Sequence, residues 1–333
     1  MHFETGKEER KEKEMDIDRL TGVEREDLLA EIAGQYYYLG RNQSEIAEAF
    51  ETNRFKVAKL LQEAREKQIV EIRIRGGRAT ASAMEEQLRD TLGLKDALVV
   101  DTQYLPYIEA LSQIGELGAR YLDRILKPDS VLGVTWGKTL YSVISRIQPS
   151  MKKKITAIQM AGNFPMSNPG ADSRSLTALA ASAYSGDFYF LDAPLYMKDP
   201  DLKSALEAEP FIAQTFSRFQ RPDAVITGIG GTSSLPLTNP LFSPYLTPED
   251  RLGSGECCGS IYGYVLDKNG SVADIPLNRK VMAMPLDRIL EAEHRLAVVC
   301  GRHKAHVTEL AIRRGYINGL ITDTDTARRI LQI

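Results

Sequence analysis

Seven short apolar segments separated by helical stretches constrain the fold of this 333-residue chain more than any other feature. Repeated strand–helix alternation is typical of an α/β domain with a mostly parallel, Rossmann-like sheet. Helices are expected at 107–126, 138–147 and 174–184. The expected strands lie in DALVVD (96–101), SVLGVTW (130–136), ITAIQMAG (155–162), FYFLDAPLY (188–196), DAVITGIGG (223–231), RLAVVCG (295–301) and YINGLITD (316–323).

Four of these strands end in residues suited to a small anionic ligand, and ligands of open α/β sheets gather at the carboxyl ends of strands. The ends combine glycines, which let a ligand approach the backbone, with cations and hydroxyls. Each feature alone is more often a simple turn or cap, but together they predict a phosphate-tolerant pocket. The candidates are Gly137, Lys138, Thr139, Gly228, Gly230, Lys304 and Asp323. Asp323 could instead cap a helix. The neighbouring Trp136 could either pack in the protein or stack on the ligand.

The N-terminal region, residues 25–75, has the spacing of a helix-turn-helix followed by a short strand or wing. Asn42 is a good helix cap, with Glu45 in the capping-box position, and Asn53 can cap the next helix. One position departs from the motif: Glu51 occupies the tight turn, where a residue comfortable at positive φ is favoured.

A local excess of cations distinguishes this region from the rest of the chain, whose formal net charge is −3. Residues 54–75 contain seven Lys or Arg against three Glu, an excess of four. A solvated charged face is the ordinary explanation of such a run. Combined with the motif spacing, however, the charge favours DNA binding. The residues expected to face DNA are Gln43, Ser44, Asn53, Arg54, Phe55, Lys56 and Lys59.

The remaining segments complete the expected organisation. Residues 1–24 are expected to form a flexible charged tail, 76–83 a linker, and 84–333 the large domain, which would bind the ligand and mediate oligomerisation. The sequence contains neither a signal peptide nor a membrane span, so a cytoplasmic location is expected. The cysteines and histidines show no metal-ligand spacing, so no metal site is expected.

Taken together, the motifs resemble those of the SorC family of bacterial transcriptional regulators. The resemblance covers nearly the whole chain after about residue 25. It rests on QYYYLGRNQSEIAEAF, KVAKLLQEAREKQIVEIRI, VLGVTWGKTL, IQMAGN, DAVITGIGG, GSGECCGSIYGYVLDKNG, KAHV and GYINGLITDTDTA. It implies a helix-turn-helix, an effector domain similar to sugar-phosphate isomerases and deaminases, and oligomers, commonly tetramers, that respond to a phosphorylated sugar.

The resemblance also implies an effector site and two departures from the family pattern. The implied site comprises Gly137, Lys138, Thr139, the Gln159–Gly162 turn, Gly228, Gly230, Ser260 and Lys304. Some members carry a lysine, able to form a Schiff base, where this chain has Ala161. Many carry an acidic residue for sugar hydroxyls where this chain has Ser260, so the ligand's polar pattern is expected to differ.

The sequence therefore predicts a DNA-binding regulator, acting as a repressor of a carbohydrate-utilisation operon and controlled by a phosphorylated sugar or polyol. A dimer or tetramer is expected, because one helix-turn-helix makes few contacts. No catalytic residue and no cofactor are expected. Two alternatives remain: a sugar-phosphate isomerase or deaminase with a helical assembly domain, and a redox or metal sensor using Cys257, Cys258, His303 and His306.

Overall fold

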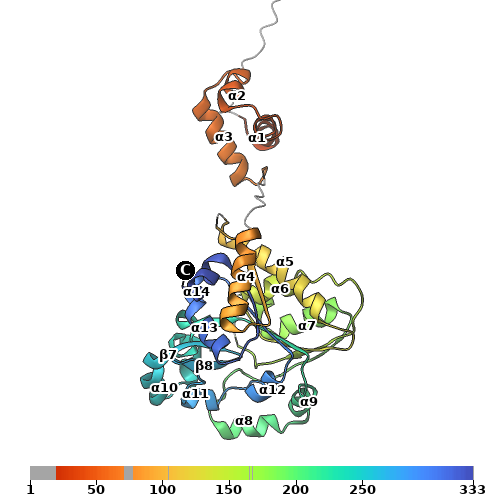
Figure 1. Ribbon diagram of the computed structural model, residues 1–333, viewed down its shortest axis with the longest axis vertical. Coiled ribbons are helices and arrows are strands. Elements are labelled where there is room, and N and C mark those ends of the chain that lie inside the picture. The colour runs from red at the N-terminus through yellow and green to blue at the C-terminus, as the bar shows by residue number, and fades with distance from the viewer. Residues whose placement is uncertain (1–19, 71–77, 104, 165, 167, 333) are drawn as a thin grey trace, which may run out of the picture. The chain divides into compact units, whose positions relative to one another are not determined.

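A computed structural model describes residues 20–70, 78–103, 105–164, 166 and 168–332 of the chain. Its contacts divide the chain into two compact units, Met1–Arg75 and Gly76–Ile333, each considered by itself (Figure 1). Within the described residues, no helix has both the length and the apolar character needed to span a membrane.

The small unit consists of three helices around one apolar core. They are α1 (Gly22–Tyr37), α2 (Gln43–Ala49) and α3 (Arg54–Glu66). Because α1 begins at Gly22, the end of the segment expected to be a tail is helical. Apart from Ile69 and Val70, the segment IVEIRIR (69–75), in which the short strand or wing is predicted, lies outside the described residues. The core side chains are Leu28, Leu29, Ile32, Ala33, Ile46, Ala47, Val57, Leu60, Leu61 and Ala64.

Local hydrogen bonds define the turn between α2 and α3. The Asn42 side chain accepts from the backbone N–H groups of Ser44 and Glu45, and Glu45 completes a capping box. The Asn53 side chain caps α3 by accepting from Lys56 N at 2.9 Å. Glu51 adopts φ +48°, so the turn does use the left-handed conformation that its sequence disfavours. Both predicted caps are confirmed.

The segment expected to be a linker, 76–83, is helical from residue 78, where α4 (Arg78–Leu92) begins. Its side chains at Ala81, Met84 and Leu88 recur at helical spacing and join the core of the large unit. From residue 78 onward, the segment expected to be a linker is therefore the start of a helix.

A seven-stranded, fully parallel sheet organises the large unit, and each predicted strand segment contributes to it. Its order is β1-β10-β9-β5-β2-β3-β4. Segment 188–196 contributes only its start, to the short edge strand β4. The strands are β1 (Asp96–Val100), β2 (Val131–Val134), β3 (Thr156–Gln159), β4 (Asp187–Tyr189), β5 (Ala224–Thr227), β9 (His294–Val298) and β10 (Gly319–Asp323).

Helices cover both faces of this sheet (Figure 1). One apolar cluster joins the strands to α5 (Tyr107–Ile125), α6 (Lys138–Ile144) and α7 (Ser173–Ala183). The other joins them to α4, α12 (Leu286–Leu290), α13 (Ala305–Arg313) and α14 (Thr324–Leu331). The further helices are α8 (Pro200–Glu207), α9 (Pro210–Arg218), α10 (Pro248–Leu252) and α11 (Pro276–Arg279).

A second, three-stranded antiparallel sheet was not predicted. It consists of β6 (Ile229–Gly231), β7 (Cys257–Ile261) and β8 (Tyr264–Asp267). Segment 223–231, expected to be one strand, is thus divided between two sheets. The turn from β7 to β8 uses Tyr262 at φ +57° and Gly263 at φ +98°, which are the positive values that a two-residue hairpin requires.

The strand order places a topological switch point between β2 and β5. From β2 the chain proceeds outward to β3 and β4, whereas from β5 it proceeds to β9 and β10 on the opposite side. The loops that leave β2 and β5 therefore diverge, and the sheet opens a crevice at the carboxyl ends of these two strands.

Candidate functional site

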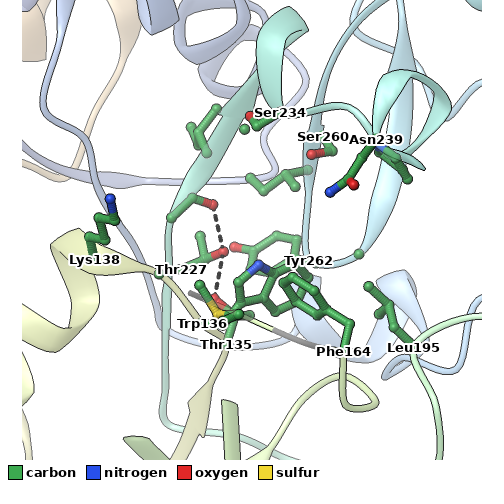
Figure 2. A pocket seen from close by; sticks show the side chains of 18 of the residues that line it. Thr135, Trp136, Lys138, Phe164, Leu195, Thr227, Ser234, Asn239, Ser260 and Tyr262 are labelled. Atoms are coloured by element: carbon green, nitrogen blue, oxygen red, sulfur yellow. Dashed lines mark hydrogen bonds between the residues drawn. The ribbon is translucent and has the colours of Figure 1, made fainter. Parts of the chain in front are cut away.

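A cavity of about 430 Å³ lies at this switch point (Figure 2). The ends of β2 and β5 contribute to its lining, together with β7 and the turn after β9. The lining residues are Tyr107, Thr135, Trp136, Gly137, Lys138, Thr139, Phe164, Met166, Leu195, Tyr196, Thr227, Gly228, Ile229, Gly230, Ser233, Ser234, Pro236, Asn239, Phe242, Ser260, Ile261, Tyr262, Gly263 and Lys304.

Two buried threonines join the ends of β2 and β5 within this lining. Thr135 Oγ1 donates to Thr227 Oγ1 at 3.1 Å, and the Thr227 hydroxyl donates to Gly228 O at 2.9 Å (Figure 2). This chain of hydrogen bonds fixes the backbone where the two loops separate. The Gly228 position is also the point where the chain leaves the large sheet for the small one.

Two lysines give the lining a positive charge. Lys138 begins α6 after Gly137, whose φ of +133° favours glycine. Lys304 lies in the 3-10 turn Arg302–Lys304 after β9. Among the described residues that line the cavity, none is Asp, Glu or His. The charged groups of the lining itself are therefore all cations, and the carboxylate that acts on Lys304, that of Asp323, lies outside the lining.

Desolvation lowers the pKa of Lys304 from its ordinary value, while neighbouring Cys300 and Asp323 act in the opposite direction. A less hydrated ammonium group interacts more strongly with an anion than an exposed one does. Lys304 is therefore suited to bind an anionic group inside the cavity, and such a group would restore its pKa.

Small polar groups line another part of the cavity. A Cβ added at Gly230 would meet Ser260 Oγ at 2.5 Å and Ser234 Oγ at 3.1 Å, so glycine here leaves room for two hydroxyls. Asn239 lies nearby in the same close-up view (Figure 2). Hydroxyl and amide groups both donate and accept hydrogen bonds, which suits a polyhydroxylated ligand.

Aromatic side chains form the remaining wall. Trp136 packs edge-on against Phe164, with ring centroids 5.1 Å apart, and Phe164 lies against Phe242. Tyr196 contacts Phe242 edge-on at 5.3 Å and donates its hydroxyl to Gly263 O. Trp136 thus both packs and lines the cavity. The rings are held by one another, so this wall is preformed.

Three of the predicted ligand residues do not line the cavity. Gln159 is fully buried and donates to Ala161 O, Asn163 Oδ1 and Ser173 Oγ. At Gly162, an added Cβ would meet Pro194 O at 2.4 Å, so this glycine serves close backbone packing. Asp323 caps α14 and accepts from Gly301 N at 2.9 Å. It therefore supports the turn that carries Lys304.

The structure brings the other predicted ligand residues together: Trp136, Gly137, Lys138, Thr139, Gly228, Gly230, Ser260 and Lys304. Apart from Trp136, sequence reasoning missed the aromatic wall, and it missed the polar residues of the segment 232–246. That segment consists of 3-10 turns without hydrophobic periodicity. Its only local signal is the density of Ser, Pro and Asn.

The predicted DNA-facing residues lie on or beside the first turns of α2 and α3. Ser44, Asn53, Arg54, Phe55 and Lys59 are exposed, while Gln43 and Lys56 are half-buried. The side-chain oxygen Oδ1 of Asn53 already accepts a hydrogen bond from Lys56 N as the cap of α3. Further along α3, Arg25 forms a bidentate pair with Glu63, which lowers the pKa of Glu63 and joins α1 to α3.

A family model described as "Putative sugar-binding domain" matches residues 79–332, which is nearly all of the large unit. The chain belongs to this family, that of the SorC-type transcriptional regulators. Curated relatives agree. The sorbitol operon regulator of Klebsiella pneumoniae is 26% identical over 311 residues, covering 92% of this chain and 98% of the relative. The deoxyribonucleoside regulator of Bacillus subtilis is 26% identical, covering 92% and 98%.

Solved structures share the fold. The crystal structure of the full-length sorbitol operon regulator SorC from Klebsiella pneumoniae superposes with a TM-score of 0.69 at 24% identity, covering 92% of this chain and 99% of that one. A domain described as that of "a possible sugar-binding transcriptional regulator" from Arthrobacter aurescens gives a TM-score of 0.66 at 23% identity, covering 77% of this chain and 100% of that one. The SorC-family resemblance seen in the sequence is confirmed, and the relatives favour a regulator over an enzyme.

The described cysteines and histidines of this SorC-type chain bear on the redox-sensor and metal-sensor alternative. No group of three potential metal ligands occurs among the described residues. Burial raises the pKa of Cys257, of Cys258 and, to about 12, of Cys300. Thiols held in the protonated form are poor nucleophiles, so the geometry gives the sensor alternative no support.

Proposed function

We propose that this SorC-family regulator binds a phosphorylated sugar or polyol in the switch-point cavity and represses a carbohydrate-utilisation operon. The observation that best supports this proposal is the composition of the cavity lining. Two lysines without a carboxylate favour an anionic ligand, while the hydroxyls and the Asn239 amide suit a ligand rich in hydroxyls. Because position 260 is a serine and not an acidic residue, the sugar hydroxyls would form hydrogen bonds with neutral partners.

The small unit is the DNA-binding part in this proposal, with α3 as the recognition helix in the major groove. Its support is the capped turn between α2 and α3 and the exposed cations at the start of α3. Gln43 and Ser44 at the start of α2 would contact phosphates. Because its partner is chromosomal operator DNA, the protein would act in the cytoplasm.

Control by the ligand requires a coupling between the two units. Two or four copies of the chain would present paired small units to half-sites one helical turn apart. A ligand that favours an assembly with a different spacing weakens operator binding, and operator binding then weakens ligand binding by the same factor.

A thermal-unfolding screen of the full chain against phosphorylated and free sugars and polyols tests the ligand. A compound at a hundredfold excess over its Kd stabilises the large unit by about 2.7 kcal/mol. A shift that requires the phosphate, and that is reduced in Lys304→Met, supports the proposal. A shift produced equally by the unphosphorylated compounds would contradict the phosphate assignment.

Binding to duplexes selected from a random library tests the DNA assignment. Lys59→Ala is expected to weaken binding and to reduce the slope of log affinity against log salt by about one. The matched control is Lys152→Ala, an exposed lysine of the large unit. Equal affinity and slope for wild type and Lys59→Ala would contradict the role given to α3.

A further inference from the structure

We propose that Phe55 reads the 5-methyl group of a thymine in each operator half-site, and that Arg54 holds its ring in position. This inference rests on the proposed DNA-binding role of α3. It adds a prediction about the base sequence of the operator, which the fold and the family membership leave open.

Phe55 is exposed although the helix that carries it has a complete apolar face. Its side chain is 73% exposed, whereas Val57, Leu60 and Leu61 of the same helix are buried in the core of the small unit. All residues of α3 are described, and Phe55 is its single exposed large apolar side chain. Core packing therefore does not account for a phenylalanine here.

The position of Phe55 is one from which a recognition helix reaches bases. It is the second residue of α3, directly after the capped turn, and N-terminal residues of a recognition helix contact base edges. Lys59, four residues on, lies on the same face of the helix and is exposed. The Phe55 ring therefore lies beside cations that attract the phosphates of DNA. With these cations on the phosphates, the ring would face the bases of the groove.

Arg54 restrains the ring. Its guanidinium carbon lies 4.9 Å from the centroid of the Phe55 ring, in a cation–π contact. This contact orders two exposed side chains before DNA arrives, and it leaves most of the ring surface accessible. A preorganised ring loses less conformational entropy on binding than a freely rotating one.

The chemistry of the major groove selects the base. A phenyl ring has no hydrogen-bond donor or acceptor for base edges, and the apolar group that the groove presents is the thymine methyl. Burying one such methyl group contributes about a fourfold gain in affinity. A cytosine at the same position carries only a hydrogen on C5, so the ring would lose this apolar contact.

Replacing single thymines by uracil in the selected operator tests the inference, because the exchange deletes only the methyl group. With the full chain, one thymine per half-site is expected to show a loss of about fourfold when replaced. In Phe55→Ala the affinity of the parent operator is lower, and the same replacement has no further effect. Phe55→Leu keeps an apolar side chain and should retain part of the penalty.

Tyr38→Ala is the matched control, because Tyr38 is an exposed aromatic of the small unit that lies outside α3. It should leave the uracil penalty unchanged. If wild type binds its operator specifically but no thymine couples to Phe55, this inference is overturned while the DNA-binding proposal stands. If wild type selects no duplex, the DNA-binding proposal itself is overturned. Circular dichroism of each variant confirms that the small unit remains folded.

Discussion

Thr135, directly after β2, and Thr227, at the end of the adjacent parallel strand β5, share a hydrogen bond of 3.1 Å in the lining of the cavity. Both side chains are buried, and the bond lies where the loops after β2 and β5 diverge. The segments that leave β2 and β5 and lead to Lys138 and Gly230 are therefore anchored to each other and not only to their own strands. The shape of the cavity therefore depends in part on Thr135 and Thr227, although neither side chain is charged.

Thr227→Val is expected to lower both stability and ligand affinity. The substitution keeps the shape of the side chain but leaves Gly228 O without the Thr227 hydroxyl. Loss of such a buried hydrogen bond costs about 1–2 kcal/mol of unfolding free energy. Denaturant unfolding and ligand-induced thermal shifts measure the two effects. Unchanged stability and an unchanged ligand shift would show that the threonine pair is dispensable.

Thr322→Val should have the opposite effect on stability and serves as the matched control. Thr322 is fully buried in β10, and its Oγ1 lacks a hydrogen-bond partner among the described residues. Removing an unsatisfied buried hydroxyl stabilises by up to about 1 kcal/mol, and valine favours a strand. An increased denaturation midpoint with unaltered ligand affinity is expected. A decrease would indicate a hydrogen bond from a buried water molecule.

The sequence predicted the large sheet because its strands, apart from the exposed edge strand β4, are largely buried and read as continuous apolar runs. It did not predict β7 and β8, because glycines interrupt the apolar pattern of 257–267 and the pairing partner, β6, was assigned to the preceding strand. The glycines and lysines at the ends of the predicted strands indicated where the cavity lies. Its aromatic wall comes from segments distant in the chain, whose meeting depends on tertiary packing.

Gln159 illustrates why single site residues are harder to predict than the location of a site. It lies near the carboxyl end of a predicted strand segment and carries a polar amide, as a ligand residue would. In the structure it is the last residue of β3, and its buried side-chain nitrogen donates to three local acceptors. Sequence spacing gives the end of the strand, but the direction of the side chain depends on neighbours contributed by α7 and the loop before it.

The three cysteines are expected to react slowly with thiol reagents in the folded protein. Burial raises the pKa of Cys257 and Cys258, and that of Cys300 to about 12, so few thiolates form near neutral pH. Alkylation of the native chain should be at least about tenfold slower than that of the urea-unfolded chain. Rapid stoichiometric modification, accompanied by loss of operator binding, would instead support the redox-sensor alternative.

The affinity for a phosphorylated ligand is expected to fall at alkaline pH because Lys304 loses its charge there. Desolvation lowers the pKa of Lys304, so its deprotonation begins at lower pH than that of an ordinary lysine. An anion binds the charged form, so affinity is highest below this pKa and declines as pH rises through it. Loss of a charge-assisted hydrogen bond of this kind costs about tenfold in affinity.

Calorimetric titration between about pH 7 and pH 10 measures this dependence, using the phosphorylated compound identified by thermal unfolding. Lys304→Arg provides the comparison, because arginine stays charged throughout the range and should flatten the profile. Lys138→Arg, at the exposed lysine of α6, should leave the wild-type profile in place. If the affinities of wild type and Lys304→Arg fall in parallel as pH rises, another group titrates. A lysine that binds the anionic group of the ligand cannot lose its proton without weakening the complex.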